Sequence, residues 1–194
     1  MRRVKQNTHL GGNTRFNIKF LVNCAGFGKF EHDENLNTDV KLNMIDLNIK
    51  AIVSMTDYSL KYMSSGSGII NISSTAAFQP IPYINIYAAT KSFVLHYSRA
   101  LNQELKYKNI RVLAVCPYWT KTNFFDRAVT DGKKEVVIKY IVMYKPKDVV
   151  EKALKDCNYN EAYSSQVFKS IERICSTDNI TTLKKGTQIY RARI

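Results

Sequence analysis

The sequence predicts an α/β protein that is built on a parallel sheet. Three short apolar segments, 18–23, 69–74 and 110–116, alternate with two long amphipathic segments, 42–63 and 87–108. The short segments are apolar at nearly every position, which is typical of strands that are buried on both faces. Strands and helices that alternate in this way form a parallel sheet with helices packed on it.

The first strand and helix follow from local signals. The apolar segment 18–23 is followed closely by Ala25 and Gly26. This favours a buried strand that stops at a turn. The segment 42–63 carries apolar residues at helical spacing, and we expect one long amphipathic helix there. Serines and glycines at 64–68 end this helix.

The second half of the alternating pattern is equally regular. The segment 69–74 is rich in β-branched residues, which favours a strand. Apolar side chains recur every fourth residue between 87 and 108, so we expect a second long helix. The strand 110–116 is stopped by Pro117, which cannot donate a backbone hydrogen bond.

Beyond Pro117 the pattern is weaker. We expect an aromatic loop over 118–126 and one more helix over 147–154, and no clear period follows Cys157. The predicted organisation therefore has three parts. These are a basic, irregular N-terminus (1–17), a partial catalytic domain (18–156) and a basic C-terminal segment of uncertain structure (157–194).

Length and composition indicate a globular protein without a membrane span. The chain has 194 residues, of which 45% are hydrophobic, and this rules out wholesale disorder. No stretch approaches the roughly 18 apolar residues of a membrane-spanning helix, and polar residues at 6–9 argue against a secretory signal. We expect a cytoplasmic protein with reduced thiols and neither a disulfide framework nor a metal site. The widely separated cysteines are Cys24, Cys116, Cys157 and Cys175.

The net charge of +13 is concentrated at the two ends of the chain. Residues 1–20 hold five basic residues and no acidic one, and residues 133–194 hold 13 basic and seven acidic residues. A basic end can contact nucleic acid or an anionic surface. No helix-turn-helix, zinc-finger or base-stacking pattern accompanies the charge, so we expect solvated termini and no nucleic-acid partner.

Tyr87 and Lys91 form the strongest chemical motif in the sequence. They are four residues apart, so both side chains lie on one face of the predicted helix. A cation about 4 Å from a phenol, at an effective dielectric of about 20, contributes on the order of 4 kcal/mol. We therefore expect Lys91 to lower the pKa of Tyr87 by roughly 3 units, into a range useful for acid–base chemistry.

Further polar residues follow the strands on either side. Ser74 ends its strand 13 residues before Tyr87, and ligands of parallel sheets bind at this carboxyl edge. Segments 23–26 and 117–122 end the neighbouring strands at the same edge, and Asn48 lies in the helix between the first two strands.

These motifs resemble those of the short-chain dehydrogenase/reductase family. Residues 21–26, Leu-Val-Asn-Cys-Ala-Gly, resemble the family's Asn-Asn-Ala-Gly strand, with Cys24 in place of the second Asn. Ser74 and the Tyr87-x-x-x-Lys91 pair match the catalytic signature in type and spacing. Segment 117–122 resembles the family's Pro-Gly motif, although Tyr118 replaces the Gly. The resemblance covers residues 18 to 155.

The resemblance implies a Rossmann-like, NAD(P)-dependent oxidoreductase of carbonyls and alcohols. Tyr87 would be the general acid–base, and Ser74 would hold the carbonyl oxygen. Lys91 would lower the phenol pKa and bind the nicotinamide ribose, and Asn48 would support a proton-relay water. Besides Tyr87 and Lys91, the implied cofactor-binding residues are Asn23, Ala25, Gly26, Pro117 and Thr122.

The resemblance also indicates an N-terminally truncated member. The first βαβ half of the fold, with its glycine-rich turn for the pyrophosphate, needs about 30 residues or more, and only 17 precede the first predicted strand. Gly11-Gly12 lacks a preceding strand, so we do not interpret it as a phosphate loop. We expect binding of NAD or NADP to be weakened or lost.

The sequence predicts the class of substrate and the kind of partner in less detail than the catalytic residues. Apolar and aromatic residues that follow the strands favour a hydrophobic substrate, such as an acyl chain or a steroid-like ring: Phe78, Tyr118 and Trp119 first, with Ile81, Tyr83, Phe124 and Phe125. The family resemblance implies a homo-oligomer that forms through the two long helices. The alternative is a catalytically silent family fragment that acts by association with another chain.

Overall fold

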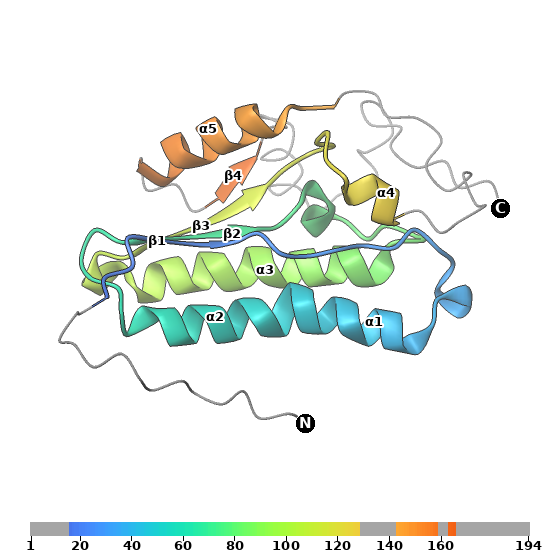
Figure 1. Cartoon of the computed structure of the whole chain (residues 1–194), viewed down its shortest axis with the longest axis horizontal. Coiled ribbons are helices and arrows are strands. Elements are labelled where there is room, and N and C mark those ends of the chain that lie inside the picture. The colour runs from blue at the N-terminus through green and yellow to red at the C-terminus, as the bar shows by residue number, and fades with distance from the viewer. Residues whose placement is uncertain (1–15, 129–142, 159–162, 166–194) are drawn as a thin grey trace.

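A four-stranded parallel sheet forms the centre of the protein (Figure 1). In the computed structural model, residues 16–128, 143–158 and 163–165 are described. The strands lie side by side in chain order: β1 (Phe20–Asn23), β2 (Gly68–Ile72), β3 (Arg111–Cys116) and β4 (Tyr163–Ser165). All three pairings are parallel, with Leu21 opposite Ile69 and Ile69 opposite Val112. The predicted fold class is therefore confirmed.

One face of the sheet is covered by two long helical segments that run parallel to each other and antiparallel to the strands (Figure 1). The first comprises α1 (Thr38–Ile45), a π-helical turn (Asp46–Lys50) and α2 (Ala51–Leu60). It begins earlier than the predicted residue 42, because the Asn37 side chain caps it by accepting a 2.7 Å hydrogen bond from the Asp39 amide.

The second helical segment is α3 (Asn85–Glu104), followed by a 3-10 turn at Lys106–Lys108. Leu101 and Leu105 pack against Ile69 and Val112 of the sheet. Nearer the start of the helix, Leu95 packs with Ala114 and Cys116 of β3. In the second half of the helix, the apolar spacing that predicts it therefore reflects burial against β2 and β3, whereas Phe93 of the same repeat is exposed.

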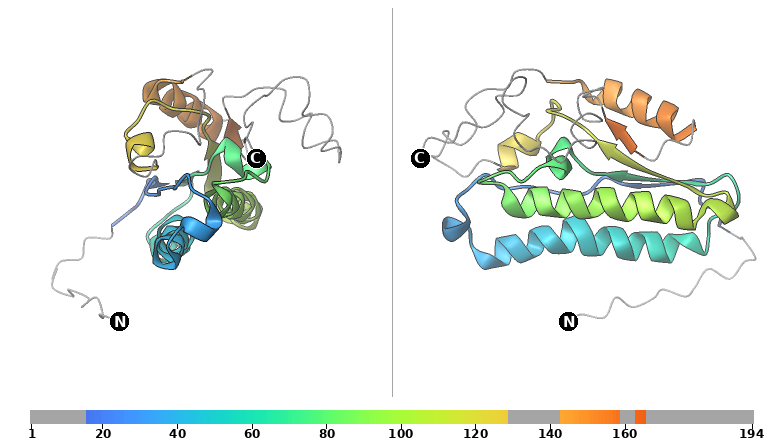
Figure 2. Two further views of the ribbon diagram at one scale, coloured as in Figure 1. Left: turned by 90° about the vertical axis from the view of Figure 1, so that its right-hand side faces the viewer. Right: turned by 180° about the vertical axis from the view of Figure 1, so that it is seen from behind.

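The opposite face of the sheet is covered by α5 (Pro146–Asn158), as Figure 2 shows from the end and from behind. Ala153 and Cys157 of this helix pack on Ile70, Leu113 and Val115. The sheet therefore lies between two helical layers, which explains why its strands are apolar on both faces.

Two elements differ from the sequence predictions. The predicted loop over 118–126 ends in a short helix, α4 (Phe124–Ala128). The strand β4 pairs with β3 beyond Cys157, where the sequence shows no period. It is only three residues long, which is too short for an alternating pattern to stand out.

Apolar side chains remain exposed on β1 and on the long helices. Phe20 and Val22 of β1 are 47% and 54% exposed, and β1 forms the outer edge of the described sheet. On the helical layer, large apolar side chains are also exposed: Leu42, Leu47, Val53, Met55, Tyr58 and Phe93. Assembly through this layer stays a prediction.

Several further features concern only the described part of the chain. No described helix is both long and apolar enough to cross a bilayer. Cys24, Cys116 and Cys157 are free thiols. The described side chains form no group of three or more potential metal ligands. Gly11-Gly12 and Cys175 lie outside the described residues.

Candidate functional site at the carboxyl edge of the sheet

The loops that follow β1, β2 and β3 meet at the carboxyl edge of the sheet, beside the first half of α3. A Cβ atom placed on Gly26 would lie 2.9 Å from Asn48 Oδ1 and 3.5 Å from Lys91 Nζ. The Thr75 amide after β2 donates a 3.1 Å hydrogen bond to the Pro117 carbonyl after β3. The structure therefore brings the residues that the sequence singles out to one edge.

Asn48 lies in the π-helical turn and is completely buried. Its Oδ1 accepts a 3.1 Å hydrogen bond from the Phe27 amide, and its Nδ2 donates a 2.9 Å bond to the Phe27 carbonyl. The Asn48 side chain thus satisfies both backbone hydrogen-bonding groups of Phe27, in the loop after β1. A π-helical turn is uncommon and is frequently found at functional sites, and here it carries this amide.

Thr90 connects Asn48 to α3, and the sequence analysis does not include it. Its Oγ1 accepts a 3.0 Å hydrogen bond from Asn48 Nδ2 and donates a 2.8 Å bond to the Tyr87 carbonyl. Thr90 is 2% exposed. Its position directly before Lys91 is the only sequence signal that could have identified it.

Lys91 is buried with its charge close to the sheet. It is 4% exposed, and its Nζ donates a 2.7 Å hydrogen bond to the Ile72 carbonyl at the end of β2. Burial lowers the pKa of Lys91 from 10.5 to about 8. An ammonium group has three donors, and within the described part of the chain the other two have no partner. The site can therefore bind a ligand that offers hydroxyl or carbonyl oxygens.

The phenol of Tyr87 is more basic than the sequence predicts. Lys91 Nζ lies 5.6 Å from the centre of the Tyr87 ring. Burial raises the pKa of Tyr87 to about 12, although the side-chain hydrogen bond with Ser74 lowers it. The predicted lowering by Lys91 is wrong for this structure, because desolvation of the phenolate is the largest effect on the pKa.

The Ser74 hydroxyl lies between the end of β2 and Tyr87. It caps the 3-10 turn Thr75–Phe78 by accepting a 3.1 Å hydrogen bond from the Ala76 amide. Because that bond uses a lone pair of the oxygen, the hydroxyl proton stays available to Tyr87 or to a substrate oxygen. The neighbouring Ser73 donates a 2.7 Å bond to the Lys91 carbonyl and fixes α3 against the strand.

Two glycines let the loop after β1 approach these side chains closely. The Cβ of an alanine at Gly26 would crowd Asn48, and one at Gly28 would lie 2.9 Å from Tyr87 Cδ2. A Cβ added at Gly28 would also lie 3.1 Å from Phe124 Cζ. No motif in the sequence marks Gly28 as a site residue. Ala25 is exposed beside Gly26. The loop forms a tight, backbone-lined wall next to Lys91, which fits a bound dinucleotide.

Asn23 differs from the other predicted cofactor residues. Its Nδ2 donates hydrogen bonds to Asn71 Oδ1 at 2.7 Å and to Thr56 Oγ1 at 3.4 Å. Asn71 in turn donates a 2.9 Å bond to Ser98 Oγ. The Nδ2 group of Asn23 is therefore engaged inside the protein, and we expect its backbone to be the part that faces a ligand.

Pro117 and Thr122 lie in the segment after β3, and Thr122 is exposed. The Thr122 hydroxyl accepts a 3.3 Å hydrogen bond from the Phe124 amide at the start of α4. This bond orients the segment between β3 and α4, and the exposed hydroxyl keeps its proton for a ligand.

An aromatic cluster lines one side of the site. The Phe124 ring lies 5.4 Å from that of Tyr87, and the Phe125 ring lies 5.1 Å from that of Trp119. Phe30, which the sequence analysis does not include, is buried beside Trp119 at 6.5 Å.

The other two predicted substrate residues lie at the rim of this cluster or outside it. Tyr118 contacts the rings of Trp119 and Tyr144, and burial raises its pKa. Phe78 instead packs against Leu95 and Cys116 in the core, and this packing fits a structural role.

Fold and site together define an α/β protein with a Rossmann-like sheet and a tyrosine, a serine and a lysine at the carboxyl edge of that sheet. The family model for short chain dehydrogenases matches residues 11–133, which is more than half of the chain. The chain belongs to the short-chain dehydrogenase family of oxidoreductases, so the resemblance seen in the sequence is confirmed.

Individual relatives agree with this assignment. The chain is 36% identical over 145 residues to 17-beta-hydroxysteroid dehydrogenase type 3 of Mus musculus, covering 70% of this chain and 47% of that protein. It is 36% identical over 113 residues to the very-long-chain 3-oxoacyl-CoA reductase of Homo sapiens, covering 54% and 36%. The matches therefore span less than half the length of these two relatives.

A solved structure matches over most of the chain. The short-chain dehydrogenase from Sphingobium yanoikuyae in complex with NADPH has a TM-score of 0.68 and is 25% identical. The match covers 90% of this chain and 68% of that one. The described part of the chain therefore has the same fold as that enzyme.

Proposed function

We propose that the protein transfers a hydride between a nicotinamide cofactor and an apolar carbonyl or alcohol, with Tyr87 as the acid–base group. One observation carries this proposal: at the carboxyl edge of the sheet, Tyr87 hydrogen-bonds with Ser74 and has the Lys91 ammonium 5.6 Å from its ring centre. Family membership supports the reaction class.

The residues at this edge suit a nicotinamide dinucleotide, which supplies or accepts the hydride when bound. The unpartnered donors of Lys91 would bind a ribose hydroxyl, and the Gly26 backbone would lie against it. Ala25, Pro117, Thr122 and the backbone of Asn23 would complete the contact surface. Support comes from the bound NADPH of the Sphingobium yanoikuyae enzyme.

The proton chemistry follows from the two perturbed groups. With a pKa of about 12, Tyr87 keeps its proton at neutral pH and can donate it to a carbonyl oxygen that Ser74 also holds. The phenolate that remains is stabilised by the Lys91 cation, since Lys91 is charged below a pKa of about 8. Asn48 holds the loop after β1 in place and would support a proton-relay water.

The aromatic lining favours an apolar substrate. Phe124, Phe125 and Trp119 would offer a ring-lined surface next to Tyr87. A steroid ring or a long acyl chain fits this lining. The names of two relatives, a hydroxysteroid dehydrogenase and a very-long-chain 3-oxoacyl-CoA reductase, point to the same substrate classes.

The test is a titration of the purified chain with NADH and NADPH, followed by assays with a 17-keto steroid and a long-chain 3-oxoacyl thioester. Cofactor fluorescence should change on binding, and Tyr87→Phe should lower turnover by roughly 100-fold or more without loss of binding. Tyr107→Phe is the matched control, because Tyr107 is 80% exposed and distant in the sequence from the site. No fluorescence change at millimolar cofactor, or full turnover in Tyr87→Phe, would contradict the proposal.

A second candidate function, association with another chain, is favoured by the edge strand β1. Val22 is 54% exposed on a strand whose outer edge is unpaired within the described residues, and such edges pair with other strands. In sedimentation experiments Val22→Lys should weaken association, whereas Val150→Lys on the exposed face of α5 should not. Equal behaviour of the two variants would remove this candidate.

A further inference from the structure

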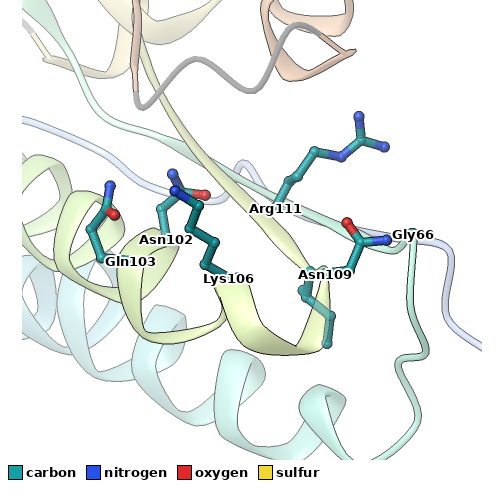
Figure 3. A pocket seen from close by; sticks show the side chains of 7 residues that line it. Gly66, Asn102, Gln103, Lys106, Asn109 and Arg111 are labelled. Atoms are coloured by element: carbon teal, nitrogen blue, oxygen red, sulfur yellow. The ribbon is translucent and has the colours of Figure 1, made fainter.

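A cavity lies at the amino end of β3 (Figure 3), whereas the candidate active site lies at the carboxyl edge of the sheet. Its volume is about 550 Å³, which is within the range of small-molecule sites. Its polar lining comes from the end of α3 and the turns before β2 and β3: Gly66, Asn102, Gln103, Lys106, Asn109 and Arg111. No residue of the candidate active site contributes to it.

The charge of the lining is positive. Among the described residues that line it, Lys106 and Arg111 are the only ionisable ones, and none of these residues carries a carboxylate. The carboxyl end of α3 contributes a partial negative charge of about half a unit, which two full positive charges outweigh. Within the described part of the chain, Lys106 forms no salt bridge, so its ammonium remains available to a ligand.

Arg111 holds a fixed position at the cavity. Its Nη1 donates a 3.2 Å hydrogen bond to the Cys157 carbonyl at the end of α5. A guanidinium group has five N–H donors in a rigid plane, a geometry that suits phosphate and carboxylate oxygens. The bond to α5 therefore reduces the side-chain entropy that ligand binding would otherwise cost.

Asn102 provides a buried donor without a protein partner. The residue is 8% exposed, and its Oδ1 accepts a 2.8 Å hydrogen bond from the Val112 amide. That bond fixes the orientation of the side chain, and its Nδ2 has no acceptor among the described residues. A buried amide without a partner costs free energy, which an acceptor atom in the cavity would recover.

The remaining wall is rigid. Asn109 adopts a left-handed conformation with φ of 53°, and its carbonyl accepts a 2.9 Å hydrogen bond from the Gly66 amide. Its side-chain Nδ2 donates a 2.9 Å bond to Ser65 Oγ. The turns before β2 and β3 are thus tied together on the side of the cavity opposite α3.

We propose that this cavity binds a small phosphate-bearing anion through Lys106, Arg111 and the Asn102 amide. Phosphate oxygens accept several charge-assisted hydrogen bonds at once, and these three donors come from different elements that surround one space. The volume exceeds that of inorganic phosphate and admits a diphosphate or a small phosphate ester. This site is independent of hydride transfer at the carboxyl edge.

The test is calorimetric titration of the full chain with inorganic pyrophosphate at constant ionic strength. We expect saturable binding of one equivalent, and Lys106→Gln should weaken it at least about tenfold. Lys108→Gln is the matched control. It also removes one positive charge, only two residues from Lys106, but the Lys108 side chain does not line the cavity. Equal weakening by both variants, or no saturable binding, would overturn the proposal.

A second variant probes the buried amide. Asn102→Asp retains an oxygen that accepts from the Val112 amide but replaces the Nδ2 donor by an anionic oxygen, so pyrophosphate binding should be lost. Unchanged affinity in a folded Asn102→Asp protein would contradict the proposed contact. If this variant does not fold, the comparison of Lys106→Gln with Lys108→Gln still decides.

A second experiment, with lipid vesicles, distinguishes a lipid headgroup from a soluble phosphate compound as the natural ligand. Sedimentation with phosphatidate vesicles and with neutral phosphatidylcholine vesicles compares a lipid headgroup with the free anion. Binding to pyrophosphate alone indicates a soluble ligand, and phosphatidate binding that Lys106→Gln weakens and Lys108→Gln does not indicates a headgroup. Binding to neither probe would overturn the site.

Discussion

The Asn48 amide donates a 3.0 Å hydrogen bond to the Thr90 hydroxyl, and this contact connects the two long helical segments beneath the active-site candidates. Thr90 donates its own proton to the Tyr87 carbonyl at 2.8 Å. The position of Asn48 is thereby tied to the turn of α3 that carries Tyr87. Both side chains are buried, so water cannot replace the contact.

Thr90→Val is expected to destabilise the protein by about 1–2 kcal/mol, because it leaves an Asn48 donor without its acceptor in a buried site. Valine has nearly the same shape as threonine, so packing changes little. Chemical denaturation of both proteins measures the effect. Thr90→Ser keeps the hydroxyl and should recover part of the lost free energy; a serine variant no more stable than the valine variant would argue against the hydrogen bond.

The pH dependence of stability should reveal the buried charge of Lys91. Its pKa is 10.5 when unfolded and about 8 when folded, so between these values the unfolded chain binds more protons. The contribution of Lys91 to the free energy of unfolding therefore rises as the pH increases from about 8 to 10.5. Relative to Lys91→Met, the wild-type free energy of unfolding should increase by about 3 kcal/mol from pH 7 to beyond pH 10.

The comparison with Lys91→Met isolates this effect from other groups. Burial also raises the pKa of Cys116 to about 12, and protons held by this thiol make stability fall with rising pH. Tyr87 acts in the same direction above pH 10. Well below pH 12 both groups keep their protons in either folded protein, so their contributions come from the unfolded chain and cancel in the difference. A difference that stays constant with pH would show that Lys91 keeps an ordinary pKa.

Gly26→Ala is expected to cost about 1–3 kcal/mol and to weaken cofactor binding. The added Cβ would lie 2.9 Å from Asn48 Oδ1, and three hydrogen bonds hold that side chain in place. Thermal unfolding and cofactor titration measure the two effects. In an Asn48→Ala background the same substitution should cost less, and a strictly additive double variant would refute the clash.

Substitutions in the buried network behind the site should cost more when they remove more hydrogen bonds between its side chains. Asn71 joins Asn23 to Ser98, and Asn71→Leu removes one hydrogen bond from each of these partners, at an expected cost of about 3 kcal/mol. Ser98→Ala removes a single contact of Asn71 and should cost about 1 kcal/mol. Denaturant midpoints check this order; a larger loss in Ser98→Ala would contradict it.

The sequence predicted the core of the fold because its signals are local. Apolar segments near β1, β2 and β3 and the four-residue repeat of α3 reflect burial against a sheet, and each lies within a few residues of its predicted position. Lys91 and Asn48 also meet where the strand order places them, next to Gly26.

Other features depend on contacts that no local pattern records. The π-helical turn at Asp46–Lys50 exists in a segment whose sequence reads as one continuous helix. The strand β4 forms because β3 offers it a pairing edge. The pKa of Tyr87 could not be predicted because the cost of its burial depends on Phe124 and Gly28, which pack around the ring.

The π-helical turn also fixes the spacing of the chain that follows it. Its hydrogen bonds join residues five apart instead of four, so the turn holds one residue more than the α-helical turn it replaces. Deleting one residue within Asp46–Lys50 would return the turn to α-helical hydrogen bonding and leave Ile52, Thr56 and Ser59 facing the interior. Elsewhere in α2, a deletion would rotate the following residues by about 100°, so the turn is where this helix can lose a residue.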